Sequence, residues 1–95
     1  MTPPPNPAAK FLLGRACATP NALDAVPNEE MLRALQRHHS GDWGDVCPED
    51  HEANEQALCE GTRLFSVYRT QAGTKFWIIT EADRSLTTIL LPEDY

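Results

Sequence analysis

The pattern of apolar and polar positions divides the chain into a helical half and a strand-rich half. In residues 28–41, Met31, Leu32 and Leu35 recur at helical spacing and fall on one face together with a histidine. Acidic residues occupy the first turn of this stretch and basic residues the last turn, where the helix dipole favours each of them. We therefore predict a helix over most of this stretch, capped by Asn28.

Two further helices are predicted, one on each side of this helix. Thr19 and Pro20 form an N-cap followed by a first-turn proline, so we expect a short helix that ends at Pro27. Another helix begins at Pro48 and ends before Gly61. Its apolar face is thin, so the acidic residues on its other faces must stay in water or meet something basic.

The last third of the chain is rich in the β-branched and aromatic residues of strands. Three runs, 62–70, 74–80 and 86–91, are separated by connections short enough for hairpins. The run 10–18 adds an N-terminal strand with room for a bulge at Gly14. The predicted fold class is α+β, a small antiparallel sheet of these strands with two to three helices packed on one face. The expected core includes the following side chains: Leu12, Leu35, Leu64, Phe76, Ile78, Ile89 and Leu91.

The length and composition of the chain indicate a single domain. We assign it to residues 10–95, and we expect the proline-rich lead, residues 1–9, to be disordered. The sequence has neither an apolar run long enough to span a bilayer nor a signal-peptide pattern at its N-terminus, so we expect a cytoplasmic protein with no membrane partner. Three cysteines cannot all pair within one chain, and we expect reduced thiols in Cys17, Cys47 and Cys59, with Cys17 the best candidate for burial.

The net charge of −6 is distributed unevenly. Residues 38–62 contain seven acidic residues and no lysine or arginine, whereas the rest of the chain has seven acids and eight bases. Such a surface suits fast, salt-sensitive docking on a protein whose basic groove normally holds nucleic acid. The alternative is a solvated face that keeps the protein soluble. The residues we expect to bind a partner are Asp42, Trp43, Asp45, Glu49, Asp50, Glu52 and Glu55.

Trp43, which lies between two Gly-Asp pairs, has two interpretations. We favour a ring that plugs the side of the core, with the glycines allowing the chain to turn sharply round it. The alternative is an exposed aromatic anchor at an interface.

The spacing of two cysteines and a histidine offers a candidate metal site, because Cys47 and His51 stand four residues apart and Cys59 lies two helical turns beyond His51. His38 or His39 would complete the four ligands that zinc requires. These spacings match no familiar zinc module. We predict no metal and no other cofactor.

Acid–base chemistry is the enzymatic alternative, since His38 and His39 lie close to two aspartates. A helix histidine facing Arg84 on the sheet could cleave RNA, because the histidine would take the 2′-hydroxyl proton and the arginine would stabilise the phosphorane. Otherwise the histidines cap their helix and Arg84 pairs within its own turn. A nuclease should present a basic surface to its substrate, and this chain has no basic cluster. We therefore expect a non-enzymatic protein.

Four strings of the chain are distinctive: "RHHSGDWGDVCPEDHEANEQAL", "GTRLFSVYRT", "GTKFWIITEADRS" and "TTILLPEDY". On these strings nearly the whole chain, from residue 10 to 95, resembles a family of short uncharacterised proteins of bacterial plasmids, integrative elements and prophages, often labelled plasmid-related proteins. The family has no settled activity, so the resemblance assigns no functional residue. It implies a mobile-element setting, in which small acidic proteins often block host defences. The expected function is therefore inhibition of a nucleic-acid-handling complex, of anti-CRISPR or anti-restriction type.

The order of helices and strands also resembles, at the level of topology, the barnase/colicin/RelE-type ribonucleases. This likeness would make His39, Tyr68, Arg84 and Thr88 the catalytic residues to test. A third alternative is a homodimeric accessory protein that pairs through an edge strand of the sheet.

Overall fold

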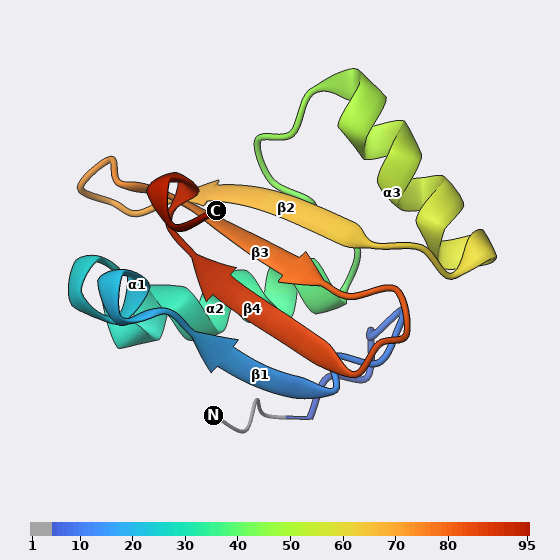
Figure 1. Ribbon diagram of the computed structural model, residues 1–95, viewed down its shortest axis with the longest axis horizontal. Coiled ribbons are helices and arrows are strands. Elements are labelled where there is room, and N and C mark those ends of the chain that lie inside the picture. The colour runs from blue at the N-terminus through green and yellow to red at the C-terminus, as the bar shows by residue number, and fades with distance from the viewer. Residues whose placement is uncertain (1–4) are drawn as a thin grey trace.

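The computed structural model describes residues 5–95, which form a four-stranded sheet and three α-helices (Figure 1). The α+β class predicted from the sequence is confirmed. The elements in chain order are β1 (Arg15–Ala18), α1 (Pro20–Ala25), α2 (Asn28–His39), α3 (Pro48–Glu60), β2 (Leu64–Arg69), β3 (Lys75–Thr80), β4 (Leu86–Leu90) and the 3₁₀ turn η1 (Pro92–Asp94).

The strands lie in the order β1-β4-β3-β2. The three C-terminal strands are antiparallel, as predicted, with Leu64 of β2 opposite Thr80 of β3. The N-terminal strand joins the sheet but runs parallel to β4, with Arg15 opposite Leu86, so the sheet is mixed rather than wholly antiparallel. The prediction missed this because three helices and two other strands separate β1 from β4, and no hairpin fixes their relative direction.

The helix ends follow the capping signals of the sequence, with one exception. Thr19 caps α1, and its Oγ1 accepts a hydrogen bond from the Ala22 amide at 3.1 Å. Gly61 ends α3 in the left-handed conformation, at φ 74°. Asn28 does not cap α2, because the helix begins at Asn28 itself, after Pro27.

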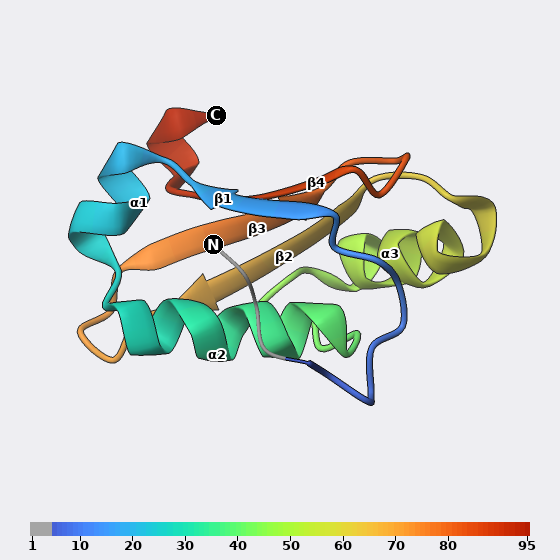
Figure 2. The same cartoon turned by 90° about the horizontal axis from the view of Figure 1, so that it is seen from below.

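Helix α2 covers one face of the sheet, while α3 lies beside the edge strand β2 (Figures 1 and 2). The core lies between α2 and the sheet, where Met31 and Leu35 pack with Phe76 and Ile78. Helix α1 contributes Ala22 to the same core, so α1 and α2 match the expected packing on one face. Within the described residues, no helix covers the opposite face of the sheet (Figure 2).

All the expected core residues are buried except Leu12, which is 75% exposed. Leu13 is buried in its place. The cause is Gly14, whose φ of 66° turns the chain sharply just before the strand begins at Arg15, later than predicted. The backbone of Gly14 also lies so close to that of Ser85 that a Cβ would overlap it. The strand alternation assumed for residue 12 therefore does not apply.

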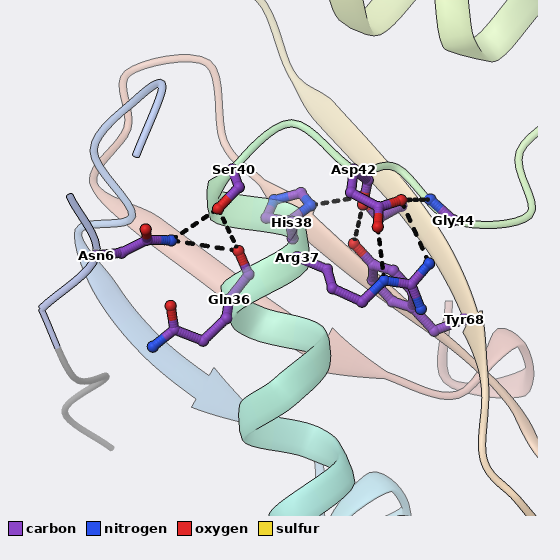
Figure 3. A network of polar contacts seen from close by, with 9 residues as sticks. Asn6, Gln36, Arg37, His38, Ser40, Asp42, Gly44 and Tyr68 are labelled. Carbon is purple, nitrogen blue, oxygen red and sulfur yellow. Dashed lines mark hydrogen bonds and ion pairs between the residues drawn. The ribbon is translucent and has the colours of Figure 1, made fainter. Parts of the chain in front are cut away.

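The predicted disordered lead falls partly outside the described residues, since residues 1–4 lie outside them. Of residues 5–9, Asn6 contacts the C-terminal end of α2, and the disorder of the lead stays a prediction. Asn6 Nδ2 donates hydrogen bonds to the Gln36 carbonyl oxygen at 3.3 Å and to Ser40 Oγ at 2.9 Å (Figure 3).

Within residues 5–95, no helix has both the length and the apolar character needed to cross a membrane. The cysteines are free thiols: Cys17 is half-buried, and Cys47 and Cys59 are exposed. Cys17 Sγ lies 3.8 Å from Thr88 Oγ1 on the sheet face that α2 does not cover.

Candidate functional site

The seven carboxylates of the acidic segment separate into two groups. Those in the loop after α2 are neutralised by the chain itself: Arg37 Nε donates to Asp42 Oδ2 at 2.8 Å, and Arg69 Nε lies 3.6 Å from Asp45 Oδ2. The Gly44 amide also donates to Asp42 Oδ1, at 3.2 Å (Figure 3). The hydrogen bond from Arg37 lowers the pKa of Asp42 below its ordinary value. These two loop carboxylates are therefore poor candidates for attracting a partner's cations.

The other carboxylates lie on α3, and none of them forms an ion pair within the described residues. Helix α3 projects beside the sheet (Figure 1), and only Asn54 and Ala57 of its residues are buried. The ion pairs in the described part of the chain all lie elsewhere: Arg33 with Glu29, Arg37 with Asp42, Arg63 with Glu81 and Arg69 with Asp45. We call the five exposed carboxylates of this helix the α3 acidic surface: Glu49, Asp50, Glu52, Glu55 and Glu60.

Asn54 attaches α3 to the sheet. Its Nδ2 donates to the Phe65 carbonyl oxygen at 2.7 Å, and its Oδ1 accepts from the Phe65 amide at 3.0 Å. The side chain thus replaces the next strand at the edge of β2. The sequence did carry a signal for this role, because Asn54 falls at helical spacing from Ala57 and Leu58 on the thin apolar face.

Replacing Asn54 by alanine should lower the free energy of unfolding by roughly 2–4 kcal/mol, because the partly buried amide and carbonyl of Phe65 lose their partners. Urea denaturation measures this change. Gln56→Ala, an amide lost from an exposed position of the same helix, is the matched control and should change stability by less than about 0.5 kcal/mol. Equal effects of the two substitutions would show that Asn54 does not hold α3 in place.

Trp43 is 2% exposed, so it plugs the side of the core rather than forming an exposed anchor. Its indole Nε1 donates to Glu55 Oε2 at 2.7 Å, which fixes one carboxylate of the α3 acidic surface. The backbone around it adds a short parallel bridge to β2, in which the Val67 amide donates to the Trp43 carbonyl and the Asp45 amide donates to the Val67 carbonyl. Trp43 therefore positions one carboxylate of the α3 acidic surface, and its own ring is almost wholly buried.

His38 is fully buried between α2 and the sheet, at the centre of a chain of hydrogen bonds. Its Nδ1 lies 2.6 Å from Ser66 Oγ and its Nε2 lies 2.9 Å from Thr80 Oγ1. Thr80 Oγ1 is 2.7 Å from Thr87 Oγ1, which donates to the Leu13 carbonyl oxygen at 2.7 Å.

The direction of each bond in this His38 network follows from its last acceptor. A carbonyl oxygen only accepts, so Thr87 gives its proton to Leu13, and Thr80 in turn donates to Thr87. His38 must then carry its proton on Nε2, and Nδ1 accepts from Ser66. The network is complete with a neutral imidazole, and burial lowers the pKa of His38 to about 3.

The polar groups of the ribonuclease alternative are engaged within the fold: His39 and Arg84 both lie against the Phe11 ring, but each is hydrogen-bonded to backbone carbonyl groups. His39 Nε2 donates to the Phe11 carbonyl oxygen at 2.8 Å, and the Tyr68 hydroxyl donates to the Asp42 carbonyl oxygen at 2.6 Å. Thr88 lies on the opposite face of the sheet from Thr87 and Ile89, the buried residues on either side of it in β4.

Arg84 is also committed to the fold, with a left-handed backbone at φ 60°. Its guanidinium donates to the carbonyl oxygens of Thr62 at 2.6 Å and Ala57 at 3.0 Å, and to two more within its own turn. It therefore ties the C-terminal end of α3 to the β3–β4 turn, and it is not free to meet a phosphate.

The remaining sequence hypotheses concern metal binding and pairing of strands. In residues 5–95, no three histidine, cysteine, aspartate or glutamate side chains are placed to hold a metal ion together. The edge of β2 is occupied by Asn54 and by the bridge at Gly44, so a dimer formed by edge strands would have to use the four-residue strand β1.

Comparisons of the chain with protein-family models, with curated proteins and with solved structures found no match.

Proposed function

We propose that this protein is a non-enzymatic inhibitor whose α3 acidic surface docks on the basic groove of a nucleic-acid-handling defence complex, of CRISPR or restriction type. The observation that carries the proposal is that five exposed carboxylates gather on one helix and that none of them forms an ion pair within the described residues. The resemblance to proteins of mobile elements supports the defence setting.

The geometry of α3 suits such docking for two physical reasons. First, clustered like charges repel one another, and a cationic partner would relieve that repulsion. Second, the helix is held to the sheet at two positions one turn apart, by Asn54 and by Arg84 on the Ala57 carbonyl, so its carboxylates are presented without a large cost in chain entropy. A groove that normally holds phosphates would meet charges of the same sign on this helix.

The proposal is tested with two variants that remove the same charge from different places. The α3-neutral variant carries Glu49→Gln, Asp50→Asn, Glu52→Gln, Glu55→Gln and Glu60→Gln. The remote-neutral variant removes five carboxylates outside α3, with Asp24→Asn, Glu29→Gln, Glu30→Gln, Glu81→Gln and Glu93→Gln.

The partner is first captured by the wild-type protein from nuclease-treated lysates of bacteria that carry CRISPR and restriction systems, and is then purified. At low salt the α3-neutral variant should bind this partner at least tenfold more weakly than wild type, whereas the remote-neutral variant should stay within about threefold. Nucleic acid should compete with the wild-type protein for the partner. If both variants bind the partner equally weakly, binding depends only on the net charge of the protein, and the proposal is contradicted.

A further inference from the structure

A groove of about 380 Å³ lies beside the α3 acidic surface, between α3 and the sheet face that α2 leaves free. Phe65, Trp77 and Ile79 supply its apolar lining from β2 and β3. Asp50 of α3 and Arg63, just before β2, supply its charged lining. The groove thus joins an aromatic surface to a carboxylate that belongs to the proposed docking surface.

The aromatic rings of the groove are arranged edge to face around Trp77, which lines the groove and keeps part of its ring exposed. Phe65 and Trp77 have centroids 5.0 Å apart with planes at 79°, and Trp77 and Tyr95 have centroids 5.8 Å apart with planes at 68°. Trp77 is half-buried and Tyr95 is 71% exposed. Partly exposed aromatic side chains in a concave site are typical anchors of protein interfaces.

One end of the groove already holds a guanidinium from the chain itself. Arg63 Cζ lies 5.6 Å from the centre of the Tyr95 ring, and its Nη1 donates to the Tyr95 hydroxyl at 2.9 Å. Its Nη2 lies 3.4 Å from Glu81 Oε2. An aromatic ring and a carboxylate therefore bind this arginine jointly. Asp50 and Trp77 offer the same two groups, but Asp50 forms no ion pair within residues 5–95.

We propose that this groove binds an arginine side chain of the partner protein, with the guanidinium against Trp77 and hydrogen-bonded to Asp50. The inference rests on the proposed function, because it takes the partner's basic surface as given and names the side chain that anchors it. Arginine is favoured over lysine, since its planar guanidinium both stacks on an aromatic ring and forks onto a carboxylate.

The test uses two probe peptides that carry equal charge, acetyl-Gly-Arg-Gly-Arg-Gly-amide and its lysine counterpart, titrated into isotopically labelled protein and followed by NMR. Wild type should bind the arginine peptide roughly three- to thirtyfold more tightly than the lysine peptide. Trp77→Leu, which keeps an apolar side chain, should reduce this ratio to about one.

Asp50→Asn and Glu52→Gln form a matched pair on α3, because each removes one exposed charge but only Asp50 lines the groove. Asp50→Asn should lower the preference for the arginine peptide over the lysine peptide, whereas Glu52→Gln should weaken the binding of both peptides equally. Both substitutions lie on the surface and leave the core intact, so this comparison holds even if Trp77→Leu does not fold.

The outcomes separate the groove from the docking surface. If wild type binds both peptides equally, and the α3-neutral variant binds neither, the proposal of an arginine site in the groove is wrong and the proposed function stands. If arginine preference survives in the α3-neutral variant, the groove acts through its rings alone and the role of Asp50 is wrong. If wild type binds neither peptide, both proposals are overturned.

Discussion

Replacing Gly44 by alanine should lower the free energy of unfolding by at least about 4 kcal/mol. Gly44 has φ 74°, a conformation that itself costs an L-residue about 1–2 kcal/mol. A Cβ at this position would also overlap the Val67 carbonyl oxygen and crowd the Tyr68 ring. The loop would have to move away from β2, breaking the bridge to Val67 and withdrawing Trp43 from the core.

Gly61→Ala is the matched control for this prediction. Gly61 has the same φ of 74°, but a Cβ there would meet no atom within 4 Å. The substitution should therefore cost only the backbone term, about 1 kcal/mol. Urea denaturation of both variants, followed by tryptophan fluorescence, measures the difference. Losses of equal size would contradict the close approach of the loop to β2.

The protein should lose about 2 kcal/mol of stability between pH 7.5 and pH 5 through His38 alone. The unfolded chain takes up a proton on this histidine as the pH falls through about 6.5, whereas the folded protein resists protonation until about pH 3. The stability contributed by neutral His38 is thus fully present above pH 6.5 and is lost progressively below it. Over the whole window the loss reaches roughly 5 kcal/mol.

The measurement compares wild type with His38→Gln, which cannot titrate, by urea denaturation at pH 7.5 and pH 5. Carboxylates contribute to both proteins, so the difference between their pH dependences isolates His38. NMR of the wild-type imidazole provides a second check, because the ring should remain the neutral Nε2–H form at pH 5. Equal pH dependence of the two proteins, together with a charged imidazole at pH 5, would contradict the His38 network.

The helices could be predicted from the sequence because their signals are local. A proline at the first turn and a glycine just past the end define α3 without reference to the rest of the chain. His38 also carried a signal, since it falls on the same helical face as Met31 and Leu35. The polar residues it would meet lie on strands far along the chain, so its partners could not be read from the helix.

The candidate docking surface was less predictable, because the ion pair of Asp45 depends on long-range packing against β2, although Asp42 pairs with Arg37 only five residues earlier. Asp42 and Asp45 looked equivalent to the acids of α3, but α2 and β2 bring Arg37 and Arg69 to them. The parallel pairing of β1 depended on long-range packing in the same way. The sequence did locate the unpaired negative charge within residues 38–62. The structure places the unpaired carboxylates of that segment on α3.

The most direct test of the account is the salt dependence of binding to the captured partner, measured for wild type and for the α3-neutral variant. If the exposed carboxylates of α3 face cations on the partner, wild-type affinity should fall steeply between 50 and 300 mM salt, while the variant should bind weakly with a much flatter dependence. Identical affinities and slopes for the two proteins would contradict the claim that α3 is the docking surface.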